Sequence, residues 1–148
     1  MEIRAYLDTN LYISFLLKPG SPAPPSTIVR AGLQGRFRLL IGDPTVDEVL
    51  NKTASKSSLS KKITRSQVDA LLDVLVVAGE PISLAASVIP AISRDRKDDY
   101  LLAYAIAGRA THLVTGDRDL VELEHDFGFQ IVTPTQFVRI LEQEEPNN

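Results

Sequence analysis

Short apolar runs alternate along the chain with longer segments whose apolar residues recur at helical spacing. Runs of branched and aliphatic residues bounded by turn residues predict buried strands, here at 3–7, 37–41, 112–115 and 130–132, with a shorter candidate at 81–84. Apolar residues three and four positions apart predict helices at 10–17, 26–33, 44–53, 64–78, 95–107 and 134–141. Asp43 and Asp95 are the predicted caps of two of these helices. The alternation predicts an α/β protein whose parallel sheet is covered on both faces.

The chain length of 148 residues fits one domain with one core. We expect a single domain over residues 1–142, followed by a charged tail at 143–148. No apolar run approaches the roughly 20 residues that a membrane span requires. Asp8 interrupts the apolar segment that a secretory signal would need. The expected location is therefore the cytoplasm, with no membrane partner.

The composition restricts the kind of metal site that the chain can build. It contains no cysteine and two histidines, His112 and His125. Thiolate nucleophiles, disulfides and cysteine-based zinc sites are therefore excluded. A metal site would consist mainly of oxygen ligands, which favours Mg²⁺ or Mn²⁺ over zinc. The net charge of −3 argues against a protein that only coats nucleic acid, but it is compatible with a carboxylate cluster.

Two acids stand directly after predicted strands. Asp8 follows the strand at 3–7, and Asp117 follows the strand at 112–115. Ligands of parallel α/β sheets bind beyond the carboxyl ends of the strands, so both acids are candidate ligands. Each also has a purely structural interpretation. Asp8 could cap the next helix, although Asn10 is the better placed cap, and Asp117 could belong to a Gly-Asp turn.

Further candidate acids lie on predicted helices. Asp47 and Glu48 are neighbours on the helix at 44–53, and periodicity does not decide which of them faces the protein. Asp98 shares a helix face with apolar residues and should point inward, where an acid usually has a partner. Carboxylates at such positions suit phosphodiester hydrolysis, because one or two Mg²⁺ or Mn²⁺ ions can activate water and stabilise the leaving oxyanion.

At this point the sequence resembles the PIN domain family, and in particular the toxins of bacterial toxin–antitoxin pairs known as VapC toxins. The resemblance extends from residue 3 to about residue 132. It rests on four segments in order: Leu7-Asp8-Thr9-Asn10, Pro44-Thr45-Val46-Asp47-Glu48-Val49-Leu50, Arg94-Asp95-x-x-Asp98-Asp99 and Leu113-Val114-Thr115-Gly116-Asp117-Arg118-Asp119-Leu120. It implies a three-layer α/β/α sandwich with a central parallel sheet of about five strands. It also implies a Mg²⁺- or Mn²⁺-dependent ribonuclease directed at single strands.

Carried over residue by residue, the resemblance makes four acids both catalytic and metal-binding. These are Asp8, Glu48, Asp98 and Asp117. Two alternatives stay open, since Asp99 could replace Asp98 and Asp119 could share the role of Asp117.

Supporting roles follow from the same resemblance. Thr115 would orient a ligand or a water molecule, and Asn10 would brace Asp8. Arg96 and Arg109 depart from the residues common in the family, without touching the proposed ligands.

The resemblance also implies partners, namely an RNA substrate, an antitoxin protein that blocks the site, and a second copy of the chain in a homodimer. Arg94, Arg96, Lys97 and Arg118 flank the predicted acids, and 52–65 is a basic stretch, so these cations could bind phosphates or could simply be solvated. No aromatic cluster for base stacking is visible in the basic segments.

Two other interpretations compete with a nuclease. A PIN-like domain could bind RNA or act as a scaffold without catalysis. An aspartyl phosphatase or a phospho-acceptor domain is the other rival, but Asn10 stands where such a phosphatase needs its second Asp.

Overall fold

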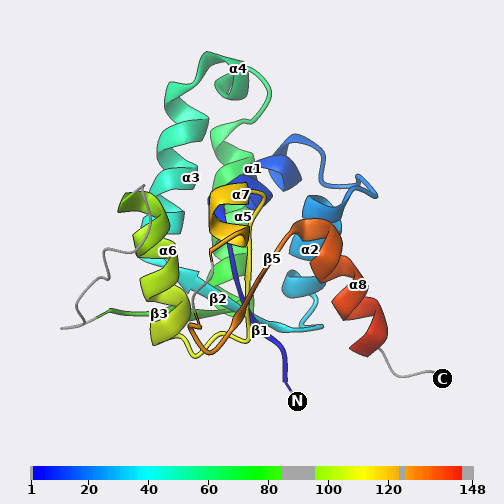
Figure 1. The fold of residues 1–148 in the computed structure, drawn as a ribbon. Helices are drawn as coiled ribbons and strands as arrows, with labels where there is room; N and C mark the ends of the chain where they lie inside the picture. The colour runs from blue at the N-terminus through cyan, green and yellow to red at the C-terminus, as the bar shows by residue number, and fades with distance from the viewer. Residues whose placement is uncertain (1, 85–95, 124–125, 145–148) are drawn as a thin grey trace.

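The computed structural model describes residues 2–84, 96–123 and 126–144. Strands and helices alternate along these residues, as Figure 1 shows. The strands are β1 (Arg4–Leu7), β2 (Arg38–Gly42), β3 (Gly79–Ile82), β4 (His112–Val114) and β5 (Gln130–Val132). The helices are α1 (Thr9–Leu17), α2 (Pro24–Leu33), α3 (Asp43–Ser55), α4 (Ser57–Ser60), α5 (Arg65–Ala78), α6 (Arg96–Ala107), α7 (Arg118–Val121) and α8 (Pro134–Glu144).

The five strands form one parallel sheet in the order β3-β2-β1-β4-β5. The predicted α/β class with about five parallel strands is confirmed. The chain places β2 and β3 on one side of β1, and β4 and β5 on the other. The side on which successive strands are added therefore changes between β1 and β4. In parallel sheets a crevice lies at the carboxyl ends of the two strands that flank such a change, here β1 and β4.

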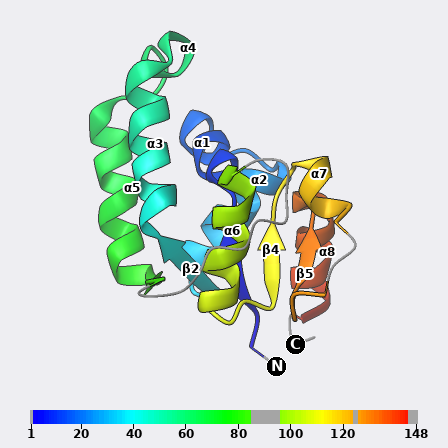
Figure 2. The same ribbon diagram turned by 60° about the vertical axis from the view of Figure 1, so that its left-hand side comes forward.

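Each face of the sheet has its own apolar core, because successive side chains of a strand point to opposite faces. In β1, Ala5 and Leu7 belong to the first core and Tyr6 to the second. The first core includes buried residues of α1, α2, α3, α5 and α8, and the second includes residues of α6 and α7. Figure 2 shows α6 in front of the sheet, on the face that carries the second core. The result is a three-layer α/β/α arrangement.

Several element boundaries differ from the prediction. Helix α2 begins at Pro24 instead of residue 26, because prolines are compatible with the first turn of a helix, where their missing N–H costs nothing. Helix α3 begins at Asp43, so its N-cap is Gly42 and the predicted cap Asp43 is wrong. Strand β3 occupies 79–82 and not 81–84. The short helix α7 was not predicted, and the predicted cap Asp95 lies outside the described residues.

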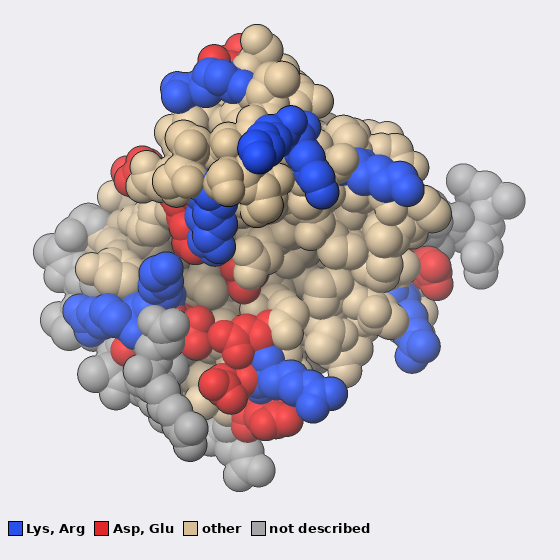
Figure 3. Space-filling model, turned by 90° about the horizontal axis from the view of Figure 1, so that it is seen from above, with Lys and Arg blue, Asp and Glu red and all other residues tan. Residues whose placement is uncertain are grey.

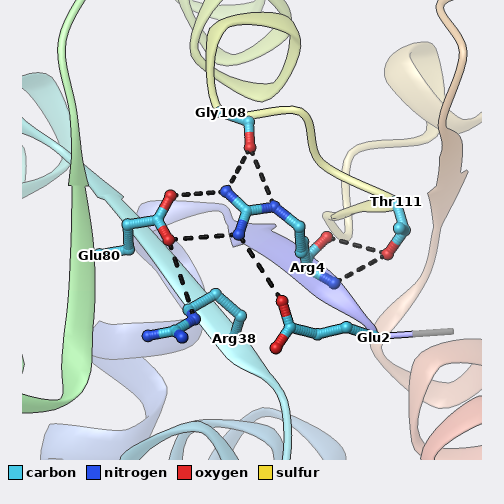
Figure 4. A network of polar contacts seen from close by, with 6 residues as sticks. All are labelled: Glu2, Arg4, Arg38, Glu80, Gly108 and Thr111. Carbon is cyan, nitrogen blue, oxygen red and sulfur yellow. Dashed lines mark hydrogen bonds and ion pairs between the residues drawn. The ribbon is translucent and has the colours of Figure 1, made fainter.

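A polar network fixes the amino end of the sheet (Figure 4). The guanidinium of Arg4, at the start of β1, contacts both carboxylate oxygens of Glu80 on β3. It also donates two hydrogen bonds to the carbonyl of Gly108, at 2.7 and 3.2 Å. The hydroxyl of Thr111 accepts a hydrogen bond from the Arg4 amide and donates one to its carbonyl, both at 3.0 Å. Together these bonds connect β1, β3 and the turn between α6 and β4.

None of the described helices is both long enough and apolar enough to span a membrane.

Candidate functional site

A pocket of about 540 Å³ opens at the carboxyl edge of the sheet, at the crevice between β1 and β4. Figure 3 looks down onto this edge of the sheet and shows acidic side chains bordering a hollow, with basic side chains beside it. Residues from β1, α1, α3, α6 and the loop after β4 line the pocket: Tyr6, Asp8, Asn10, Pro44, Thr45, Glu48, Lys52, Lys97, Asp98, Tyr100, Leu101, Tyr104, Gly116 and Asp117.

All four acids that the sequence singled out line this pocket. They come from separate elements: the end of β1, helix α3, the first turn of α6 and the loop after β4. In sequence order they are Asp8, Glu48, Asp98 and Asp117. Their near neighbours Asp47, Asp99 and Asp119 are not among the described residues that line it. The fold thus favours Asp98 over Asp99 and Asp117 over Asp119 as candidate ligands.

Both oxygens of Asp8 are held by hydrogen bonds. Oδ1 accepts from the backbone N–H of Asn10 at 3.3 Å, so Asp8 is the N-cap of α1. Oδ2 accepts from the hydroxyl of Thr115 at 2.8 Å. Thr115 is fully buried, and its hydroxyl also accepts from the backbone N–H of Asp117 at 3.1 Å. A single threonine therefore connects the acids that follow β1 and β4.

One expectation about this region needs correction. Asn10 is not the helix cap, because α1 begins at Thr9 and leaves Asn10 inside the helix. Asn10 braces Asp8 through its backbone N–H, whereas its side-chain oxygen accepts from the ammonium of Lys52 at 3.4 Å. The capping and ligand interpretations of Asp8 are therefore not exclusive, since a capping carboxylate can still face the pocket.

Glu48 is held by two partners within the pocket region. Its Oε1 lies 2.8 Å from the Nζ of Lys52, one helical turn further along α3. Its Oε2 accepts from the hydroxyl of Thr9 at 3.1 Å. The contact was not predicted from the sequence, in which Lys52 belongs to a basic stretch, although a Glu followed four residues later by a Lys is a known helical pairing.

Asp98 is buried, 8% exposed, as its helix face predicted. Asp99 is also buried, at 3%, but away from the pocket. Asp117 is half-buried, and its Oδ1 accepts from the backbone N–H of Asp119 at 2.9 Å. Asp119 and Asp47 are exposed to solvent.

Three tyrosines form an aromatic wall of the pocket, which the sequence analysis did not predict. Tyr6 and Tyr104 have ring centroids 5.9 Å apart, and the hydroxyl of Tyr6 is hydrogen-bonded to Thr45 at 2.8 Å. Tyr100, one turn before Tyr104 on α6, lies 5.5 Å beneath the guanidinium of Arg96. Burial raises the pKa of Tyr6 and of Tyr104, so both hydroxyls stay protonated at neutral pH.

The wall was missed because Tyr6 is distant from the others in sequence. The sequence did offer one signal for it. Tyr100 and Tyr104 are four residues apart on the helix that carries Asp98, so they lie on one helix face. The wall also explains why a glycine ends β2: a Cβ on Gly42 would come within 2.5 Å of the Tyr6 hydroxyl and the Tyr104 ring.

The donor atoms of the pocket fit Mg²⁺ or Mn²⁺. Four carboxylates provide the hard oxygen ligands that these ions prefer, and the chain has no cysteine. His112 pairs with Thr111 away from the pocket, and His125 lies outside the described residues. Among the residues described, no three acids or histidines stand close enough to form a ready metal cluster. Like-charged carboxylates repel one another, and each of Asp8 and Glu48 is instead held by local donors.

Comparison with known protein families identifies a match over most of the chain. The model of the PIN domain family matches residues 4–119, which is well over half of the chain and includes all four acids. No curated protein matches the chain. The fold, the order of the four acidic segments and this match agree. The chain therefore belongs to the PIN domain family, whose members are typically metal-dependent nucleases.

Proposed function

We propose that this protein is a Mg²⁺- or Mn²⁺-dependent endoribonuclease that hydrolyses RNA phosphodiester bonds. The observation that carries the proposal is the convergence of Asp8, Glu48, Asp98 and Asp117 on one pocket of a PIN domain. These four acids would hold the metal. RNA as the substrate follows from the resemblance to single-strand-directed ribonucleases.

The bound ion would supply an activated water and stabilise the charge of the leaving oxygen. The chain's own residues prepare the pocket for that chemistry. Thr115 fixes the orientation of Asp8 through its 2.8 Å hydrogen bond, as outer-shell donors commonly do for metal ligands. Lys97 lines the same pocket and adds positive charge near the position of a substrate phosphate.

Two further features suit a single-stranded substrate. Tyr100 presents a half-buried ring at the pocket, against which an unpaired base can stack. Beyond Lys52, exposed cations stand before and after the short helix α4, between the end of α3 and the start of α5, where they can contact the phosphates of an RNA strand that leaves the pocket. These residues are Lys56, Lys61, Lys62 and Arg65.

The cellular role that we propose is that of the toxin of a type II toxin–antitoxin pair. It is supported by the resemblance to VapC toxins, which also suggests a homodimer and an antitoxin that blocks the pocket. Expression without a partner should arrest bacterial growth, and the Asp8→Asn variant should not. Sedimentation of the purified chain tests the homodimer.

The enzymatic proposal is tested by incubating single-stranded RNA with the protein and Mg²⁺. The wild type should cleave, chelation should stop cleavage, and Asp8→Asn and Asp117→Asn should each reduce the rate by at least about 100-fold. Asp47→Asn is the matched control, because Asp47 is an exposed acid outside the pocket. Unchanged activity in both pocket variants would refute the proposal.

A non-catalytic PIN domain that binds RNA or acts as a scaffold is the second candidate. The observation in its favour is that the described acids are not gathered into a ready metal cluster. The same assay distinguishes it, since such a protein would bind RNA without cleaving it at any metal concentration.

A further inference from the structure

Lys52 places a positive charge inside the acidic pocket. Its Nζ lies 2.8 Å from Oε1 of Glu48 and 3.4 Å from Oδ1 of Asn10. The side chains of Lys52 and Glu48 are 22% and 31% exposed, and both residues line the pocket with the other three acids. The ammonium therefore neutralises one of the four carboxylates that would hold a metal.

This pair differs from an ordinary surface pair on a helix. Arg65 and Asp69 show the ordinary case, with the same four-residue spacing but side chains 72% and 54% exposed. Such exposed pairs contribute little and are easily exchanged for water. Lys52 is instead partly enclosed and has a second partner on α1, so its ammonium is held at the pocket from two sides.

A divalent ion and the Lys52 ammonium would compete for the same carboxylate oxygen. Two cations cannot both lie against Oε1 of Glu48 without strong mutual repulsion. Binding of the ion at Glu48 therefore requires the ammonium to leave. The stem of Lys52 is flexible, and the pocket that the ammonium already lines is where a substrate phosphate would enter.

We propose that Lys52 is the resident counter-ion of the pocket and is exchanged for the divalent ion, after which its ammonium binds a substrate phosphate. This inference rests on the proposed function. It predicts that metal and RNA bind cooperatively, because a phosphate that attracts the ammonium away from Glu48 removes the competitor of the metal.

The test is a titration of the intact protein with Mn²⁺, with binding followed by electron paramagnetic resonance. Lys52→Gln should bind Mn²⁺ on the order of fivefold more tightly than the wild type. Lys52→Arg keeps the charge and should bind within about twofold of the wild type. Lys18→Gln is the matched control, since it removes the same charge from an exposed residue at the end of α1, which neither lines the pocket nor belongs to the cations proposed to bind RNA.

The second arm repeats the titration with a short single-stranded RNA in which the scissile bonds are replaced by non-hydrolysable ones. The RNA should tighten Mn²⁺ binding to the wild type and to Lys18→Gln, but not to Lys52→Gln. Melting temperatures of all variants establish that each is folded.

The outcomes separate this inference from the proposed function. If the wild type binds no Mn²⁺, or if Asp8→Asn binds it as well as the wild type does, both proposals fail. If Asp8→Asn weakens Mn²⁺ binding while Lys52→Gln binds Mn²⁺ no more tightly than Lys18→Gln, the exchange is refuted and the metal site stands.

Discussion

Thr115 and Asp8 illustrate how single residues prepare the pocket. The strand-end position of Asp8 could be recognised from the sequence, because an apolar run ends there. An orienting role for Thr115 was expected only through the family resemblance, since its hydrogen bond to Asp8 joins two residues 107 positions apart in the chain. Local patterns identify candidate acids, but the partners that orient them depend on which strands become neighbours.

We predict that Thr115→Val lowers the proposed ribonuclease activity by about 10- to 100-fold, as loss of an outer-shell hydrogen bond commonly does. The change replaces a hydroxyl by a methyl group of similar size, so the fold should be retained. Thr53→Val is the control, because Thr53 is also buried but bonds to carbonyls of its own helix. Equal effects of the two changes on activity would show that the Thr115 hydroxyl has no special role.

The choice between adjacent acids on α6 is also testable. Asp98 lines the pocket and Asp99 does not, although both are buried. We expect Asp98→Asn to reduce cleavage by at least about 100-fold and Mn²⁺ binding by at least about tenfold. Asp99→Asn should lower the melting temperature but leave Mn²⁺ affinity within about threefold of the wild type, because only the metal ligand itself is expected to control affinity strongly. The reverse pattern would assign the ligand role to Asp99.

At the scale of helices and strands, the sequence located most elements because their apolar periodicity is set by burial. Boundaries were less accurate where a strand passes directly into a helix. Gly42 ends β2 and caps α3 because the side chains of Tyr6 and Tyr104 leave no room there for a Cβ, and this contact cannot be recognised in the sequence. The start of α3 was therefore predicted one residue too late. Helix α7 escaped prediction because its four residues are too few to display a helical period.

The polar network at the amino end of the sheet yields a prediction about stability and pH. The Arg4 hydrogen bonds lower the pKa of Glu80 below its ordinary value of 4.5. A carboxyl group with a lowered pKa in the folded state stabilises the protein fully above pH 4.5, and this stabilisation is lost as pH falls through the folded pKa. The Glu80 side chain is 35% exposed, so the contribution should be at most about 1 kcal/mol.

Urea unfolding of the wild type and of Glu80→Gln at several pH values measures this contribution. The difference in unfolding free energy should be present at pH 7 and should shrink as the pH falls below 4.5 and through the lowered pKa of Glu80. Asp69→Asn, which breaks the exposed Arg65 pair, should show almost no difference at either pH. A difference for Glu80→Gln that grows on acidification would contradict the assigned role of the network.

At the scale of the whole molecule, charge is distributed unevenly around the pocket despite the net charge of −3. Figure 3 shows both signs of charge at this end of the molecule. The lysines on either side of α4 are proposed to bind RNA phosphates. Replacing Lys56, Lys61 and Lys62 by Gln should therefore weaken RNA binding. It should also reduce the slope of log affinity against log salt by about 2. A variant with Gln at Arg36, Arg109 and Arg139 removes the same charge elsewhere and should change the slope less. Equal slopes in the two variants would mean that the RNA does not follow α4.

We propose above all that four acids from four parts of the chain act as one metal site. Mn²⁺ binding to the wild type and to Asp8→Asn, Glu48→Gln, Asp98→Asn and Asp117→Asn tests it most directly, with the exposed Asp119→Asn as control. We predict that each of the four changes weakens Mn²⁺ binding by at least about tenfold, while Asp119→Asn leaves it unchanged. Retention of wild-type affinity in the pocket variants would contradict the account.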